Sequence, residues 1–267
     1  MNRITLNGLK VEDYIHPEEK FFADKNPTNF PLLREGLNFV NDLSVRLVRQ
    51  ITEGKWVELR RQIAPEVFDV AEEACRLLDY SSLPRLFVRR DRYMKITVGG
   101  TDYSQMLIPD FILNEFDRQM QLFVFGNAIG MFKGGHVQLA TISSVFCDGM
   151  LTAPVALVMQ AYLRAADLSS DRARLLCCQD FSAAARCILA ETGMPLSELR
   201  FWNDDETLRI VESYLEHAEA GSFDMLTENI KFIRRSTSET SPFAVRLREL
   251  LTWYRGGYEE IFSRRGA

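Results

Sequence analysis

A long, nearly uncharged helical stretch constrains the fold of this chain more than any other feature. Residues 111–136 read FILNEFDRQMQLFVFGNAIGMFKGGH, with helical periodicity throughout and almost no charge in the second half. A helix that is apolar on all faces belongs in the core, where other elements cover it. We therefore expect one continuous buried helix here.

Short strands precede this stretch, and amphipathic segments lie on both sides of it in the sequence. Apolar triplets at 86–88, 96–98 and 106–108 predict strands of a small antiparallel sheet, and Gly99-Gly100 and Pro109 close two of them. Apolar residues that recur at spacings of three and four predict helices over 32–49, 65–80, 150–177, 180–192, 204–219, 223–235 and 242–255. The predicted fold class is α+β, mostly helical.

The chain contains no obvious linker, so we expect one large domain. Pro17, Pro27 and Pro31 lie in or next to the first thirty residues, which are therefore predicted to form an irregular lead-in, 1–30. Residues 31–262 are predicted to form a single domain. The last residues, 263–267, are predicted to be a frayed tail.

Composition argues against several classes of protein. Lys and Arg number 32 and Asp and Glu number 37, for a net charge of −5, whereas a nucleic-acid binder normally presents a basic surface. Hydrophobic residues make up 46% and charged residues 26%, as in a globular protein rather than a disordered one. Without an uncharged apolar run of about 18 residues, we expect no membrane span.

The cysteines indicate the compartment. Their number, five, is odd, and their spacing fits no disulfide framework, which favours free thiols in a reducing cytoplasm. The opening residues also lack the apolar run of a signal peptide. We expect a cytoplasmic protein in which the adjacent Cys177 and Cys178 pack in the core.

Four fragments occur in an informative order. They are the apolar strand end YSQMLIPDFILNEF, a buried helix ending in KGGH, the stretch DLSSDRA at 167–173, and SPFAVR at 241–246 followed by ELLTW. Together they resemble the HtpX-like and CAAX-prenyl-protease-like zinc metallopeptidases, peptidase family M 48, in which HELGHi..GH precedes E..ADRaaLl and HPf...R..eL..W. LKVEDYIHP at 9–17 resembles the opening of the soluble bacterial branch. The resemblance runs from about residue 9 to residue 262 and implies a gluzincin-like metallopeptidase domain, with the sheet packed on a former active-site helix.

The residues at the zinc motif differ from those of the family. Aligned back from His136, the five-residue motif falls on 127–131. The family has histidines at the first and fifth positions, which share one zinc ion, and a glutamate at the second as general base. This chain has Asn127, Met131 and Ala128 there. An amide and a thioether are poor zinc ligands, and alanine cannot accept a proton.

The remaining motif positions differ as well. The resemblance places the third zinc ligand at Asp167, where the family has glutamate, and the histidine that helps stabilise the oxyanion at Ser241. The whole chain has three histidines and no HxxH or HxxxH pair. We therefore expect no zinc, no other cofactor and no catalytic residue. The degenerate positions are Asn127, Ala128, Met131, Asp167 and Ser241, and the residues expected around the former cleft are His136, Asp171, Arg172 and Arg246.

Each of these residues also has a plain structural interpretation. His136, after two glycines, is expected to bond the last carbonyls of its helix. Asp171 is expected to pair with an arginine while Asp167 is solvated, unless both keep the geometry of an inherited, empty site. Met131 is expected to fill the core. Asn127 is expected to face the old cleft and to bond Asp167 or a water.

The most basic stretch, LPRLFVRRDR at 83–92, admits two interpretations. Alternation places Arg85 on one face of a strand, with Arg89 and Phe87 near it. A solvated sheet edge is the default prediction, and the alternative is a surface for an acidic peptide or protein.

We expect a catalytically inactive pseudo-peptidase that binds a peptide or protein as a regulatory subunit. A peptide added as a strand to a sheet edge needs only backbone donors and acceptors, so peptide binding survives loss of zinc. Its partner would be a peptide, an active homologue, a biosynthetic enzyme or a second copy. Two alternatives remain open. One is an active hydrolase, either with displaced zinc ligands such as Asp167 and His136 or metal-free with Ser241 or a cysteine as nucleophile. The other is a structural homodimer formed through the apolar region Leu139–Tyr162.

Overall fold

The computed structural model describes residues 3–24, 53–92, 94–100, 104–137, 153–220 and 242–266, with backbone alone at 21–24, 153–161 and 217–220. Within these ranges the chain is mostly helical with one small sheet, so the predicted α+β class is confirmed. The helical elements are η1 (Val11–Asp13), α1 (Pro17–Asp24), α3 (Pro65–Leu77), α4 (Asp110–Glu115), α5 (Arg118–Lys133), α7 (Ala153–Cys178), α8 (Phe181–Glu191), α9 (Leu196–Leu199), α10 (Asp204–Ala220), α12 (Phe243–Gly256) and α13 (Tyr258–Arg265).

The sheet is mixed, so the predicted antiparallel sheet is wrong. Its strands are β1 (Val57–Glu58), β2 (Arg85–Arg89), β3 (Thr97–Gly99) and β4 (Gln105–Pro109), in the order β1-β2-β4-β3. β3 lies at the edge of the sheet and pairs antiparallel with β4. On its other side, β4 pairs parallel with β2. β2 is therefore an interior strand and not the predicted edge.

The basic stretch is accordingly engaged within the molecule. Phe87 on β2 is buried. Arg85 binds Glu58 on β1 with 2.9 and 2.8 Å bonds and Glu53 with a 2.6 Å bond. These contacts neutralise Arg85, and they explain why a cationic strand tolerates a place inside the sheet.

The predicted continuous helix over 111–136 is two helices, α4 and α5. Asp117 lies between them, and its Oδ1 accepts a 2.9 Å hydrogen bond from the backbone N–H of Met120. This cap satisfies an N–H that a new helix leaves free, and aspartate is among the residues that favour it. The predicted burial is confirmed for α5, in which residues 120 and 122–130 are all buried.

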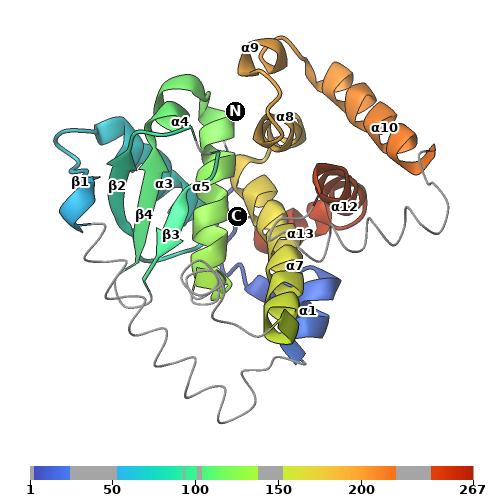
Figure 1. Cartoon of the computed structure of the whole chain (residues 1–267), viewed down its shortest axis with the longest axis horizontal. Coiled ribbons are helices and arrows are strands. Elements are labelled where there is room, and N and C mark those ends of the chain that lie inside the picture. Colours follow the sequence, from blue (N-terminus) through green and yellow to red (C-terminus); the bar gives the residue numbers. More distant parts are fainter. Residues whose placement is uncertain are drawn as a thin grey trace.

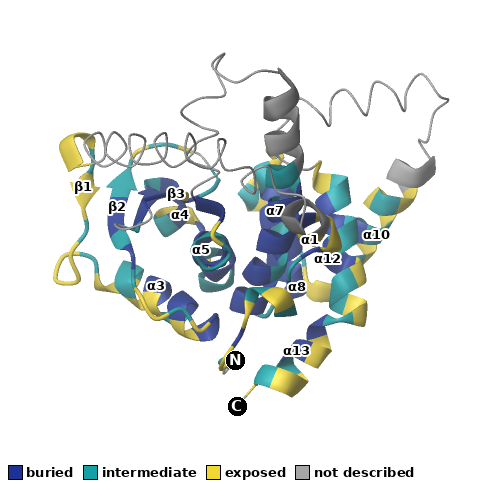
Figure 2. Ribbon diagram, turned by 90° about the horizontal axis from the view of Figure 1, so that it is seen from below, coloured by how far each residue is buried: buried dark blue, intermediate teal, exposed yellow. Residues whose placement is uncertain are grey.

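Helix α5 lies between the two halves of the molecule. Figure 1 shows the sheet with α3 and α4 on one side of it, and α7, α8, α10 and α12 on the other. The buried faces of these elements form one continuous apolar core, which Figure 2 shows as dark ribbon around α5, α7 and α8. The central position of α5 follows from its lack of a polar face.

The first described residues pair with the end of α13 (Tyr258–Arg265) and with Gly266 after it. Leu6 forms an isolated antiparallel β-bridge with Gly266, and the N–H of Asn7 donates to the carbonyl of Arg265 at 3.0 Å. The lead-in holds η1 and α1, and α13 continues to Arg265. Within the described residues, the segment predicted as an irregular lead-in thus contains two short helical elements, and the segment predicted as a frayed tail is helical to Arg265.

Other predictions lie outside the described residues. They are the helices at 32–49 and 223–235, Ser241, and nearly all of the side chains of Leu139–Tyr162. Among the residues that the structure describes, no helix combines the length and apolarity needed to cross a membrane.

Candidate functional site

Two glycines bring α5 and α7 into close contact. A Cβ atom at Gly126 would lie 2.6 Å from the Cβ of Cys177, and one at Gly130 would lie 2.7 Å from that of Ala173. The helices run antiparallel, because the later glycine on α5 meets the earlier residue on α7. The spacing GNAIG thus allows the backbones to approach closely and fixes the register between the two helices that carry most of the motif positions.

Asn127 and Met131, two of the three positions that the resemblance aligns with a zinc motif, share one face of α5. The amide of Asn127 approaches the sulfur of Met131, with 3.9 Å between Nδ2 and Sδ. Asn127 is 3% exposed and Ala128 is fully buried. The predicted bond between Asn127 and Asp167 is absent from the described contacts, because two cations surround that carboxylate.

Asp167 on α7 is held by these cations and is not solvated as predicted. Its Oδ1 accepts a 3.1 Å bond from Nζ of Lys95, and its Oδ2 lies 3.8 Å from Nε of Arg246. Burial alone would raise the pKa of Asp167, but Lys95, Arg246 and Arg174 hold it well below its ordinary range. Asp167 is therefore ionised and already neutralised.

Asp171, one turn further along α7, pairs with Arg246 on α12 as a two-pronged contact. Arg246 donates from Nε and Nη2 to the two carboxylate oxygens, each at 2.7 Å. The predicted pairing of Asp171 with an arginine is confirmed. Planar guanidinium groups match carboxylates in this geometry, and Arg246 is only 3% exposed.

Glu191, at the end of α8, completes the network. Its Oε1 accepts a 3.0 Å bond from Arg174, and its Oε2 accepts a bond from Arg246. Burial opposes the charge of Glu191, but the two arginines and Lys95 lower its pKa to about 2. The same carboxylates raise the pKa of Arg246 well above its ordinary value, although burial acts in the opposite direction.

These groups form what we call the buried ion cluster. It has three cationic and three anionic side chains, none more than 17% exposed: Lys95, Arg174, Arg246, Asp167, Asp171 and Glu191. Buried charges are tolerated where they are paired and hydrogen-bonded. The cluster joins the loop before β3 to α7, α8 and α12.

Arg172, predicted to lie near the former cleft, faces away from the cluster. It donates to the carbonyls of Tyr14 at 3.4 Å and Ile15 at 3.1 Å, and its guanidinium lies 5.3 Å from the ring centre of Trp253. Burial lowers its pKa to about 10. Arg172 therefore attaches the N-terminal segment to α7.

His136 also has a partner far away in the sequence. Its Nε2 lies 2.5 Å from Oε1 of Glu19 on α1, and both side chains are almost fully buried. The hydroxyl of Tyr162 donates to the same oxygen at 3.5 Å. The predicted bond to the helix carbonyls is wrong, because Glu19 on α1, which packs on α7, brings a carboxylate to the ring.

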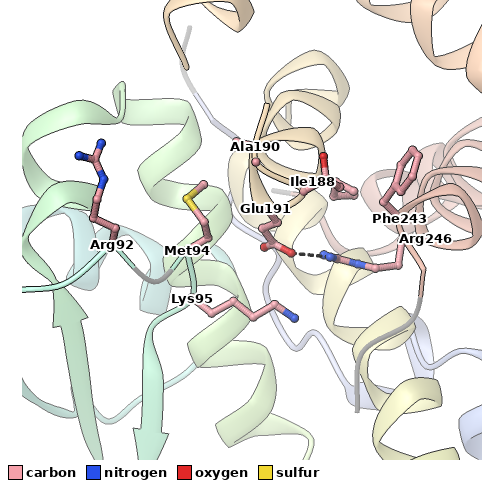
Figure 3. A pocket seen from close by; sticks show the side chains of 10 residues that line it. Arg92, Met94, Lys95, Ile188, Ala190, Glu191, Phe243 and Arg246 are labelled. Carbon is pink, nitrogen blue, oxygen red and sulfur yellow. Dashed lines mark hydrogen bonds and ion pairs between the residues drawn. The ribbon is translucent and has the colours of Figure 1, made fainter. Parts of the chain in front are cut away.

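A pocket of about 550 Å³ borders the buried ion cluster. Figure 3 shows Arg92, Met94 and Lys95 on one wall and Ala190, Glu191, Phe243 and Arg246 on the other. We call the part of the lining where the little-exposed charged side chains of Lys95, Glu191 and Arg246 meet the pocket its floor. Its volume lies within the range of about 300–1,000 Å³ found for ligand sites.

The other candidate nucleophiles and ligands do not gather at this pocket. His16 pairs with Glu249 at 3.2 Å. The thiols within the described ranges are buried, and burial raises their pKa values, that of Cys75 to about 12. Over the same ranges, no three His, Cys, Asp or Glu side chains lie together as a group able to hold a metal ion.

Sequence reasoning missed Lys95, Arg174, Glu191 and Glu19. Arg174 and Glu191 carried a usable signal, because each directly adjoins an apolar helical run, LLCC after Arg174 and CILA before Glu191. A charge beside such a run needs a buried partner. Lys95 and Glu19 carried no comparable signal.

Comparisons with protein-family models, with curated proteins and with solved structures found no match.

Proposed function

We propose that this protein is a pseudo-peptidase: a gluzincin-like fold in which ion pairs replace the metal site, acting in the cytoplasm by binding a peptide or protein segment. The proposal combines the order of the motifs in the sequence with the contacts made by their residues. It assigns no catalytic step to the chain.

The packing of α5 on α7 supports the alignment of the motifs. Phe123, Asn127 and Met131 are four residues apart and so follow one ridge of α5. The ring of Phe123 lies under Arg174, 5.1 Å from its guanidinium carbon. Because the helices are antiparallel, the ridge continues from there toward Asp171 and Asp167, the positions that the resemblance assigns to the same site.

The observation that carries the proposal is the ion pairing of Asp167. A buried carboxylate requires a positive charge nearby, which a metal ion or a basic side chain can supply. Here Lys95 and Arg246 supply it. A zinc ion at this carboxylate would have to displace an ammonium group while gaining only an amide and a thioether from α5, which are weak ligands for it.

The pocket beside the cluster supports a binding role. It joins charged donors to apolar side chains on two walls, which is the composition expected of a site that orients a ligand. A partner peptide, from another protein or from an active homologue, would place side chains there.

Hydrolysis assays test this proposal. Denatured casein and a quenched fluorescent peptide library would be incubated with the protein, with added zinc or with a chelator. We expect no hydrolysis above that of a heat-inactivated sample under either condition. The matched control is the double variant Lys95→Met/Asp167→Asn, which removes one cation and one anion together. Chelator-sensitive hydrolysis by the wild type that this variant lacks would contradict the proposal.

A further inference from the structure

The pocket beside the buried ion cluster has more hydrogen-bond donors than acceptors to match them. Both carboxylate oxygens of Glu191 are occupied, one by Arg174 and one by Arg246. Lys95 uses one bond, to Asp167, although an ammonium group has three donors. Arg92 has no hydrogen-bond or ion-pair partner among the described residues. Glu191 and Arg246 at the pocket are therefore engaged with each other and with the cluster, whereas Lys95 has unused donors and Arg92 is unpaired among the described residues.

The cations lie at two depths. The side chain of Lys95 is 17% exposed and reaches toward the floor, whereas Arg92 is exposed at the outer wall. Apolar side chains also line the pocket. Met94 lies on the side of Arg92, and Phe243, which is 37% exposed, lies opposite it across the pocket (Figure 3).

We propose that this pocket takes a glutamate side chain of a partner peptide, with an apolar residue beside it in the peptide resting on Phe243 and Met94. The inference rests on the proposed peptide-binding function and names the chemistry of the ligand. The carboxylate accepts from Lys95 at the floor and attracts Arg92 at the rim.

The depth of the donor favours a side chain over a chain end. A glutamate side chain extends from a backbone that stays at the rim, where Arg92 and Phe243 are exposed, and carries its carboxylate down to Lys95. The α-carboxylate of a peptide end would bring its backbone to the floor as well. Charge complementarity thus favours an anion, and the arrangement of donors favours one on a flexible stem.

An NMR titration of the ¹⁵N-labelled full chain tests the inference with capped pentapeptides. The probe is ALELA with an acetylated start and an amidated end. The comparison peptides are amidated ALQLA, which lacks the charge, amidated AAEAA, which lacks the apolar neighbours, and ALQLA with a free terminal carboxylate. We expect ALELA to shift amide signals around residues 92–95, 188–193 and 243–246, and each comparison peptide to bind at least about three-fold more weakly.

Variants assign the binding to the pocket. Arg92→Ala is expected to weaken ALELA binding about two- to five-fold, as for loss of one exposed ion pair. Lys95→Met/Asp167→Asn removes the floor donor with its counterion and is expected to abolish the shifts. Arg60→Ala, an exposed arginine outside the pocket, is the control and is expected to change nothing.

Several results would overturn the inference. These are equal binding of ALELA and amidated ALQLA, shifts outside the pocket, or full binding by both pocket variants. Equal binding of amidated ALELA and free-acid ALQLA would show that a terminal carboxylate binds as well as a glutamate side chain, which would also reject the inference. None of these outcomes involves hydrolysis, so the proposed function is refuted separately, by zinc-dependent cleavage.

Discussion

Replacement of Arg246 by methionine is expected to remove much of the protein's stability. Arg246 donates twice to Asp171 at 2.7 Å and once to Glu191, and lies 3.8 Å from Asp167. Methionine fills a similar apolar space and adapts its shape to gaps. The substitution therefore removes the charge and its hydrogen bonds while keeping most of the packing.

The expected loss in the free energy of unfolding is about 3–5 kcal/mol, the usual cost when one partner of a buried ion pair is removed. The cluster changes from three cations and three anions to two cations and three anions. The extra buried carboxylate is the source of the cost. The double variant Arg246→Met/Glu191→Gln should recover part of the lost stability, because the cluster then has two cations and two anions.

Urea unfolding followed by tryptophan fluorescence measures the effect. The matched control is Arg255→Met on the same helix, α12. Arg255 pairs with Glu212 in the open, and these side chains are 58% and 42% exposed. An exposed pair of this kind contributes about 0–1 kcal/mol. Losses for Arg246→Met and Arg255→Met that agree within about 1 kcal/mol would refute the reasoning.

The pH dependence supplies a second test. Despite burial, the arginines and Lys95 depress the folded-state pKa of Glu191 to about 2, from an ordinary 4.5. Such a shift contributes about 3 kcal/mol of stability, present above pH 4.5 and lost as the pH falls toward 2. Without Arg246 this carboxylate can take up a proton more easily. The loss in unfolding free energy caused by Arg246→Met should therefore be smaller at pH 4.5 than at pH 7.5. An equal loss at the two pH values would contradict the account.

Three further predictions follow from burial and packing. Gly126→Val should lower the free energy of unfolding by at least about 2 kcal/mol, because the added side chain overpacks against Cys177. Gly256→Ala, with open space around its Cβ position, should not destabilise the protein. Equal melting temperatures of the two variants would contradict this. Burial raises the pKa of Glu19, but its bonds to His136, Ser169 and Tyr162 outweigh burial and lower the pKa below its ordinary value. The stability that Glu19→Gln loses at pH 7 should therefore shrink as the pH falls below 4.5, and a difference that stays constant as the pH falls would argue against the pair. Iodoacetamide should leave the buried thiols of Cys75, Cys177, Cys178 and Cys187 unmodified until denaturant is added. Peptide mapping measures the labelling, and fast labelling of any of these thiols in the native protein would contradict their burial.

Local sequence signals were sufficient for most elements and insufficient for their pairing. Helices α3, α7, α8, α10 and α12 follow from apolar spacing within a residue or a few of their ends. The parallel pairing of β2 with β4 depends on which edge β3 joins, a choice that no single strand records. The break before α5 had a signal in Asp117, a favoured cap residue, but the periodicity on both sides of it was stronger.

The candidate site was predictable only in part. Asp167, Asp171 and Arg246 were singled out from the sequence, and the structure brings them together. Their environment was not predictable, because it depends on residues distant in the chain. Lys95 lies 72 positions from Asp167, and it converts a residue expected to be solvated into a paired one.

Zinc content tests the central claim most directly. The wild type and the triple variant Asn127→His/Met131→His/Lys95→Met would be incubated with excess zinc, dialysed and analysed by mass spectrometry for metal per chain. If ion pairs replace a former metal site, the wild type holds almost none. The variant, with two imidazoles one turn apart and Asp167 released from Lys95, holds close to one zinc ion per chain. A wild type that retains about one zinc ion per chain, or a folded variant that retains none, would contradict the account.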